Sequence, residues 1–384
     1  MDKWTGVILA GGLGSRLHPL TSKIPKPLVK VANKSMLDYA IDHLKYAGIK
    51  KIIVVVKHFG EKIKEHIKNE WQDNLYQSSD LEIHVPNVDS KDTADALRKV
   101  ENLIETDNII VSMGDIVTNL PLNNLLNWHV DKKGIATISM KTIDQPRQYG
   151  VVLLDADKKI YLFLEKPDSR ELYLSSLTQR SDLYLHTNLI NTGIYAFKRE
   201  ILDILRADSN LMDFGKNVFP YLLENRYSMY GFVEKYYWMD VGLPKTYLWA
   251  NWDLLRHYGW PVTPRGEEHN GFWYDEFPQH GEGCTFSKPS AFGNHVSIGK
   301  NNQLKNLNVI SDNVQMGDEN VIEKSVIWEN SRIGSNCIIF ESVICDNVTI
   351  KDNVKLVGCV VGPDCILEEN QALEYEKKTA NFEM

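Results

Sequence analysis

The sequence lacks long apolar runs, C-x-x-C pairs and an excess of positive charge. No apolar stretch reaches the ~18 residues that a membrane-spanning helix needs, and the N-terminal segment is too short in apolar residues for a signal peptide. A net charge of −8 argues against general nucleic-acid binding, which needs a basic surface. We therefore expect a soluble, cytoplasmic protein that binds neither nucleic acid nor a membrane.

The five cysteines all lie in the last third of the chain: Cys284, Cys337, Cys345, Cys359 and Cys365. Their number is odd and the expected setting is intracellular, so neither a disulfide set nor a zinc site is favoured, although both remain possible. We interpret them as small residues packed in an interior.

The most informative stretch spans residues 6–28, where an apolar strand (Val7 to Ala10) runs into Gly11, Gly12 and Gly14. Glycines after a strand allow positive φ angles and let backbone N–H groups approach a ligand. Successive bare amides form an anion-binding concavity. Arg16 and Lys26 follow with the fixed charge that a polyphosphate requires. The stretch predicts a phosphate-binding loop.

Two well-known phosphate loops fit this stretch poorly. The dinucleotide fingerprint needs a third glycine where this chain has Leu17, and a Walker loop needs a Gly-Lys-Ser/Thr that is absent here. The remaining alternative is a glycine-rich turn without a ligand. Three glycines, an arginine and a Pro-Lys-Pro sequence together disfavour that alternative.

The first half of the chain alternates strand and helix patterns, which predicts a doubly wound, mixed but mostly parallel sheet. Expected strands are 7–10, 52–56, 81–85 and 109–113, and expected helices are 36–47 (capped by Ser35), 61–69 and 93–104. Ligands in such sheets bind at the carboxyl ends of strands. The glycine loop and Asp115 both follow a strand.

The pattern changes after residue 150. Residues 151–154 and 160–164 predict a hairpin, 194–197 a further strand, and 219–224 and 246–258 helices. A repeat begins at Phe292: the first step, to Ile310, is 18 residues, and an aliphatic residue then recurs every 17 positions at Ile310, Ile327, Ile344 and Val361. This resembles the hexapeptide repeat of a left-handed parallel β-helix, with about four and a half coils. Cys337 and Cys365 fall where a small inward residue is expected. We expect domains at 1–258 and 291–384 with a linker, 259–290.

The run G-G-x-G-x-R-L-x-P-L-T-x-x-x-P-K-P-L, read from Gly11 to Leu28, resembles the signature of the sugar-1-phosphate nucleotidylyltransferases, or NDP-sugar pyrophosphorylases. The domain order is most similar to that of the GDP-mannose and ADP-glucose pyrophosphorylases. The resemblance implies that the chain joins a sugar 1-phosphate of the mannose or glucose type to an NTP, releases pyrophosphate and uses Mg²⁺.

The same resemblance implies roles for individual residues. Arg16, Lys26 and Lys166 would be catalytic, and Asp115 and Asp240 would bind the metal. The nucleotide would contact Leu9, Gly11, Gly12, Gly14, Ser15, Thr93, Ala94 and Gly114. The sugar would contact Tyr149, Gly150, Glu165, Asn191, Thr192 and Gly193.

Three positions depart from the family pattern and leave alternatives open. Asp92 replaces the usual glycine near the nucleotide, Leu243 replaces a threonine, and Ser35 stands in place of a proline. One alternative is a non-catalytic regulatory or assembly subunit of the same fold. Another is a bifunctional enzyme with acetyl transfer at His295. In each case we expect the β-helix to support homo-oligomerisation.

Overall fold

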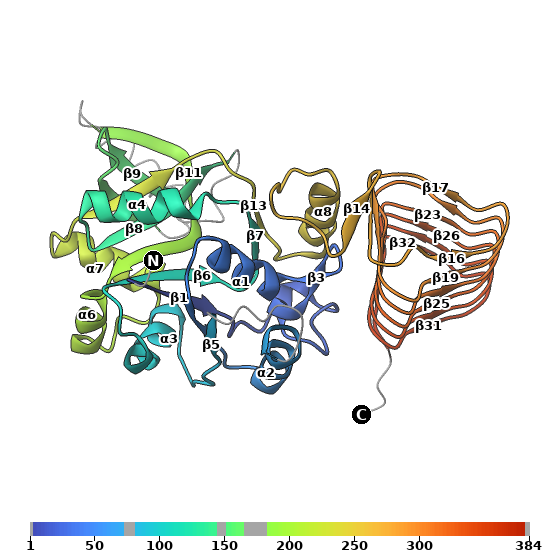
Figure 1. The fold of residues 1–384 in the computed structure, drawn as a ribbon, viewed down its shortest axis with the longest axis horizontal. Coiled ribbons are helices and arrows are strands. Elements are labelled where there is room, and N and C mark those ends of the chain that lie inside the picture. Colours follow the sequence, from blue (N-terminus) through green and yellow to red (C-terminus); the bar gives the residue numbers. More distant parts are fainter. Residues whose placement is uncertain (1–2, 73–80, 144–150, 165–182, 381–384) are drawn as a thin grey trace. The chain divides into compact units, whose positions relative to one another are not determined.

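The computed structural model describes residues 3–72, 81–143, 151–164 and 183–380 (Figure 1). The chain divides into two compact units. The sheet unit contains residues 1–12, 40–114 and 120–238, and the β-helix unit contains residues 13–39, 115–119 and 239–384. The compact units consist of discontinuous segments and do not follow the boundaries expected at residues 258 and 290. Those domain boundaries therefore stay a prediction.

Strand β1 (Trp4–Leu9) lies inside the sheet of the sheet unit. Its mostly apolar sequence is buried on both faces, and it runs parallel to β4 (Lys51–Val55) and β6 (Asn108–Met113). Strand β5 (Glu82–His84) pairs with β4. This parallel part confirms the predicted strand, helix, strand alternation.

Antiparallel strands complete the sheet on the other side of β6. The long strand β11 (Leu183–Lys198) pairs with β6, with β8 (Ala136–Thr142) and with β9 (Val151–Asp155), which in turn pairs with β10 (Ile160–Leu164). Strand β12 (Met229–Val233) pairs in parallel with β8. Of these strands, β8 and β12 were not predicted, whereas the 151–164 hairpin is confirmed.

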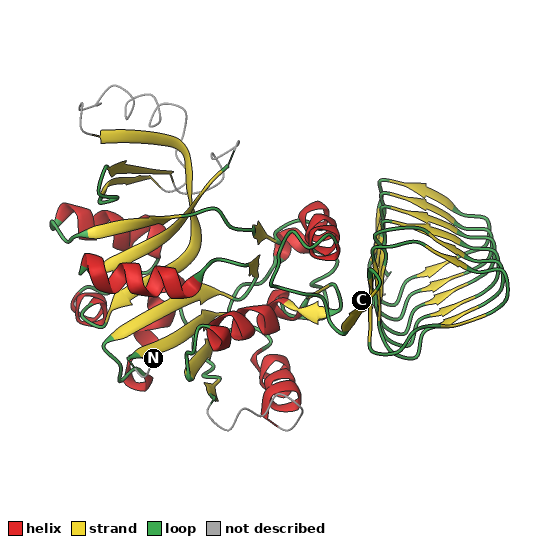
Figure 2. Ribbon diagram, turned by 45° about the horizontal axis from the view of Figure 1, so that its top comes forward, coloured by secondary structure: helices red, strands yellow, loops and turns green. Residues whose placement is uncertain are grey.

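Helices cover both faces of this sheet, as Figure 2 shows. Val7 and Ile53 point to one face, where they share a buried apolar cluster with α3 (Thr93–Lys99), α6 (Ile201–Ala207) and α7 (Phe219–Glu224). On the other face the backbone of Gly6 packs closely against Leu44 of α1 (Met36–Tyr46), because a Cβ on Gly6 would lie 2.8 Å from Leu44 Cδ1. Two further α-helices among the described residues of this unit are α2 (Gly60–Ile67) and α4 (Leu122–Lys132).

Three sheets of short strands form the stacked coils of the β-helix unit, coloured orange to red in Figure 1, and their strands pair in parallel except for the first pair of the first sheet. The first sheet comprises β14 (Glu267–His269), β15 (Phe272–Tyr274), β18 (Ser290–Phe292), β21 (Val309–Ile310), β24 (Val326–Ile327), β27 (Val343–Ile344), β30 (Val360–Val361) and β33 (Lys377–Lys378). The second comprises β16 (Gln279–His280), β19 (Ser297–Ile298), β22 (Gln315–Met316), β25 (Arg332–Ile333), β28 (Thr349–Ile350) and β31 (Ile366–Leu367). The third comprises β17 (Thr285–Phe286), β20 (Gln303–Leu304), β23 (Val321–Glu323), β26 (Ile338–Phe340), β29 (Lys355–Val357) and β32 (Ala372–Glu374).

The 17-residue repeat is confirmed in the core of the coils. Ile310, Ile327, Ile344 and Val361 stack in register and are fully buried. The coils begin earlier than expected, because β16 and β17 of the supposed linker already pair with β19 and β20. Aromatic residues such as Phe286 fill that first coil, so the aliphatic spacing does not reveal it.

The β-helix unit also contains elements that precede the coils in the sequence. These are the hairpin β2 (Lys30–Val31) and β3 (Lys34–Ser35), the pair β7 (Ile116–Thr118) and β13 (Trp238–Asp240), and α8 (Pro244–Leu255). Tyr247 of α8 accepts a hydrogen bond of 2.8 Å from Trp328 Nε1. Among the described residues, no helix has the length and apolar character needed to cross a membrane.

The cysteines are free and lie in the β-helix, as interpreted from the sequence. Cys337, Cys345, Cys359 and Cys365 are buried, whereas Cys284 is half-buried. Burial raises the pKa of the Cys337, Cys345 and Cys365 thiols, because a thiolate is poorly solvated there.

We expect one thiol of the native protein, Cys284, to react with an aromatic disulfide reagent such as DTNB. The four buried cysteines should react only after denaturation, because attack requires an accessible thiolate. Counting released thiolate with and without guanidinium chloride measures this, and Cys284→Ser is the control that should abolish the native reaction. Two or more reactive thiols in the folded protein would contradict the packing.

Candidate active site

The loop after β1 begins the candidate site, and its third glycine has a clear steric reason. Gly14 has φ of 67°, and a Cβ there would lie 2.8 Å from Lys26 Cβ and 3.0 Å from the Thr21 methyl group. Thr21 Oγ1 donates to the Gly14 carbonyl at 2.9 Å, which closes the loop. Glycine at position 14 thus permits Lys26 to approach the loop backbone.

The other two glycines differ from the expectation of positive φ, because neither Gly11 nor Gly12 adopts it. A Cβ on Gly12 would meet no atom within 4 Å, and one on Gly11 would lie 3.3 Å from Lys57 Cβ. Their expected contact with a nucleotide stays a prediction that depends on close approach. Lys57 follows the carboxyl end of β4 by two residues, and the sequence analysis did not name it as a candidate site residue. A lysine just after a buried strand can indicate a ligand site, because ligands of such sheets bind at the carboxyl ends of strands.

Lys26 is the buried cation at the centre of the site. It lies in a short 3₁₀ turn, Lys26–Leu28, between Pro25 and Pro27, whose rings restrict the backbone on both sides. Its Nζ lies 2.5 Å from Asp115 Oδ2 and 3.6 Å from Asp240 Oδ1. The structure thus brings together three residues that are far apart in the sequence.

Backbone pairing explains why the two carboxylates meet. Asp115 directly precedes β7, and Asp240 is the last residue of β13. These two strands form a two-stranded sheet, which fixes Asp115 and Asp240 beside each other. Neither β7 nor β13 was predicted, since three-residue strands give no periodic signal.

The surroundings of Asp240 raise the pKa of its carboxyl above the usual range. Burial raises its pKa, and the nearby Asp115 carboxylate raises it further, while Lys26 and Arg16 oppose the rise. The Arg16 guanidinium is exposed, and its Nη2 lies 3.4 Å from the position a Gly242 Cβ would take. The Asp240 carboxylate oxygens lie 3.4 and 3.5 Å from that same point, so Arg16 and Asp240 are neighbours.

The residues present fit a Mg²⁺ ion. Two carboxylates that converge on one point disfavour each other's charge; burial is the main cause of the raised pKa of Asp240, and the Asp115 carboxylate adds to it. In the described part of the chain, no group of three or more His, Cys, Asp or Glu residues has metal-binding geometry. Mg²⁺ suits such a site, since it takes one or two carboxylates and completes its shell with phosphates and water.

Around α3, Thr93 and Ala94 already make hydrogen bonds within the protein. The Ala94 and Asp95 amides donate to the Met212 carbonyl at 2.8 and 3.1 Å, and Thr93 Oγ1 donates to Asp213 Oδ2 at 3.1 Å. The first amides of α3 are therefore already engaged. Asp92 accepts from the Thr93 amide at the helix N-terminus, and burial together with Asp213 raises its pKa.

In the expected sugar site, two of the three described residues support the backbone of β11. Asn191 Oδ1 accepts from the Gly193 amide at 2.9 Å, at a bulge where Gly193 has φ of 81°. Thr192 is buried, and its hydroxyl contacts Ser139 Oγ at 2.5 Å and Tyr236 Oη at 3.1 Å. This buried hydroxyl network was not predicted. The sugar contacts of 191–193 stay a prediction.

The other predicted residues fall into two groups. Leu9 is half-buried at the end of β1, Gly114 is buried and its amide donates to Leu9 O at 3.0 Å, and Ser15 is exposed. Four residues lie outside the described residues: Tyr149, Gly150, Glu165 and Lys166. His295 is exposed and lies 3.3 Å from Glu276, an ordinary surface contact.

Comparisons with known proteins find a match for each of the two parts of the chain. Residues 5–257 match the nucleotidyl transferase family, and residues 271–373 match the left-handed β-helix (LbH) domain of EIF2B subunit epsilon. A mannose-1-phosphate guanyltransferase of Kluyveromyces lactis is 32% identical over 247 residues, 63% of this chain and 62% of that protein. A UTP–glucose-1-phosphate uridylyltransferase of Synechocystis is 29% identical over 258 residues, 65% of this chain and 62% of that protein. The matched region thus spans less than two thirds of these relatives.

We expect Asp240→Asn to leave the metal-free protein as stable as the wild type, or more stable by about 0.5–1 kcal/mol at neutral pH. A carboxyl whose pKa is raised on folding destabilises the fold when ionised, so the benefit should vanish as the pH falls and Asp240 becomes protonated. Thermal unfolding followed from pH 8 down to about pH 4, the ordinary pKa range of an aspartate, measures this.

Asp115→Asn is the matched control, and it should lower stability because it removes the nearer partner of the buried Lys26. If Asp240→Asn destabilised the metal-free protein as strongly as Asp115→Asn, the inferred repulsion between the carboxylates would be wrong.

Proposed function

Because this chain belongs to the nucleotidyl transferase family, we propose that it joins a sugar 1-phosphate to a nucleoside triphosphate and releases pyrophosphate. The observation that carries this proposal is the convergence of Lys26, Asp115 and Asp240, with Arg16 beside them. The sugar would be of the mannose or glucose type, since the similar proteins named above act on mannose or glucose 1-phosphate.

In the proposed reaction, a phosphate oxygen of the sugar 1-phosphate attacks the α-phosphorus of the NTP. A new P–O bond forms there, the bond to the β-phosphate bridging oxygen breaks, and pyrophosphate leaves with that electron pair. Both reactants are anions, so positioning and charge neutralisation supply most of the catalysis.

Each residue of the site has a distinct part in that scheme. Lys26 is buried and pre-positioned by Pro25 and Pro27, so it offers a fixed ammonium to the phosphates at the reacting centre. The exposed Arg16 offers a planar pair of donors to the triphosphate. Asp115 and Asp240 would hold Mg²⁺, which neutralises phosphate charge when bound.

A second candidate function rests on a different observation. The coils match the LbH domain of EIF2B subunit epsilon, and Asp92 places an extra carboxyl beside Asp213 in the expected nucleotide region. Both features suit a regulatory or assembly subunit that binds a nucleotide or an NDP-sugar without turnover. The intact set of Lys26, Asp115 and Asp240 favours catalysis.

We expect pyrophosphate release with at least one pair from a panel of ATP, GTP, UTP and CTP against mannose 1-phosphate and glucose 1-phosphate. Lys26→Met should lower kcat by about 10²–10³-fold, because a pre-organised charge at the reacting phosphates is lost. Lys351→Met, which alters a lysine on the coils, is the matched control and should leave kcat unchanged.

Absence of turnover with every pair in folded, Mg²⁺-containing protein would exclude the transferase function. Saturable binding of an NTP or NDP-sugar under the same conditions would then support the regulatory function.

A further inference from the structure

The hairpin that follows Lys26 has a buried tip, which is unusual for a two-residue turn. Ala32 and Asn33 form the turn between β2 and β3, with φ of 48° and 65°. Two positive φ angles are the signature of a type I′ turn, in which asparagine is favoured. Yet Ala32 is 0% exposed and Asn33 only 4%.

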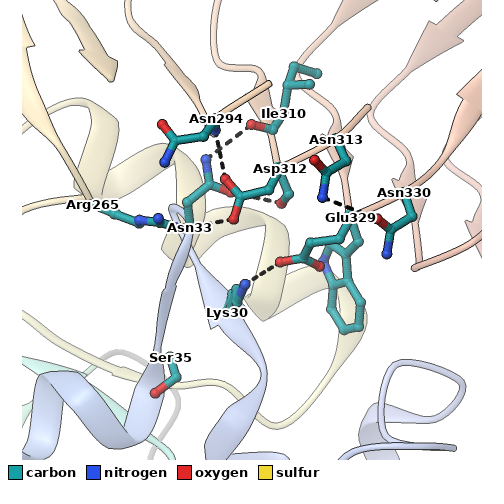
Figure 3. A network of polar contacts seen from close by, with 12 residues as sticks. Lys30, Asn33, Ser35, Arg265, Asn294, Ile310, Asp312, Asn313, Glu329 and Asn330 are labelled. Carbon is teal, nitrogen blue, oxygen red and sulfur yellow. Dashed lines mark hydrogen bonds and ion pairs between the residues drawn. The ribbon is translucent and has the colours of Figure 1, made fainter. Parts of the chain in front are cut away.

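Asn33 contacts the first coil sheet at the end of β21. Its Nδ2 donates to the Ile310 carbonyl at 3.1 Å, and its Oδ1 accepts from Ser311 Oγ at 2.8 Å (Figure 3). Ser311 is itself buried. The side-chain amide of Asn33 is therefore matched by one acceptor and one donor of the coil, which fixes its orientation.

Further contacts hold the same hairpin. The Ala32 amide donates to Asn251 Oδ1 at 2.7 Å, and the Ala32 carbonyl accepts from the Arg265 amide at 3.1 Å. The Arg265 side chain in turn pairs with Asp312 at 2.9 Å, one residue beyond Ser311 (Figure 3). Helix α8, the start of the coils and the coil edge thus all contact the turn.

Two ion pairs flank Lys26 along the chain. Lys23 pairs with Asp364, and Lys30 pairs with Glu329 (Figure 3 shows the second). Both acids belong to coil turns, so the segment around Lys26 is fixed to the coils on either side. Both pairs are partly exposed, so each contributes little energy by itself.

A short, hydrogen-bonded segment connects the hairpin with Lys26. The Val29 amide donates to the Lys26 carbonyl at 3.0 Å, and the Met36 amide donates to the Val29 carbonyl at 3.2 Å at the base of the hairpin. Val29 and Val31 are fully buried. A displacement of Asn33 therefore moves the turn that carries Lys26, since little slack exists between them.

We propose that the β-helix positions Lys26 through Asn33, which makes Asn33 a positioning residue of the candidate active site. The part of this inference that concerns catalysis rests on the proposed transferase function. The coils thus help to fix the geometry of the candidate active site. A misplacement of about 1 Å at a catalytic group can reduce rate by up to 10²-fold.

The test compares Asn33→Gly with Asn313→Gly. Glycine accepts the positive φ of both positions, so each variant removes only the side chain. Asn313 is exposed, has φ of 60°, and its side chain bonds only within the coils, to Asn330 Oδ1 at 3.2 Å. It is therefore a control matched in residue type, backbone and substitution (Figure 3).

We expect Asn33→Gly to lower kcat about tenfold while KM changes less than threefold, and Asn313→Gly to change neither. Hydrogen exchange measured in parallel should be faster at the Leu28 and Val29 amides, which close the Lys26 turn, in Asn33→Gly alone. Ser311→Ala should show a smaller effect of the same kind, and it provides a second variant if Asn33→Gly folds poorly.

A kcat equal to that of the wild type, or unchanged exchange at Leu28 and Val29, would overturn the inference. If the wild-type protein itself shows no turnover, the proposed function fails instead, and the exchange of those two amides alone decides whether Asn33 positions Lys26.

Discussion

The buried ammonium of Lys26 is the constraint on which the candidate site depends. A charge with little exposure to water destabilises a fold unless carboxylates lie within a few ångströms. Lys26 has two, Asp115 and Asp240, and only the pairing of β7 with β13 brings them to the same point. Glycine at position 14 is part of the same arrangement, because a Cβ there would lie 2.8 Å from Lys26 Cβ.

The same constraint explains why segments from distant parts of the sequence belong to the β-helix unit. Residues 13–39, 115–119 and 239–242 are far apart in the chain, yet they form one compact unit with the coils. A stack of coils with a continuous aliphatic core is a rigid support, and sites held on rigid elements keep their geometry more closely than sites on free loops. The coils therefore give the residues around Lys26 a rigid support.

Much of this arrangement was predictable from the sequence, and the exceptions have physical causes. Strict spacing revealed the coils, because Ile310, Ile327 and Ile344 occupy equivalent places in every turn. The first coil was missed because aromatic side chains replace the aliphatics there. Asn33 was missed as well, since a hairpin tip reads as an exposed turn and its burial depends on residues almost 280 positions later. Local patterns carry no information about such partners.

The charges of the site show what a bound divalent cation would contribute to the proposed function. Lys26 and Arg16 supply two positive charges, and ionised Asp115 and Asp240 supply two negative ones, so the cluster of four has no net charge. A neutral cluster cannot by itself attract a triphosphate in a protein with an overall charge of −8. The two aspartates would oppose phosphate binding without a cation. With Mg²⁺ bound by these carboxylates, the same residues would present a net positive surface to the two anionic substrates of the proposed reaction. The pKa of Asp240 is raised mainly by burial and further by Asp115, so a cation bound beside the two carboxylates would favour its ionised form.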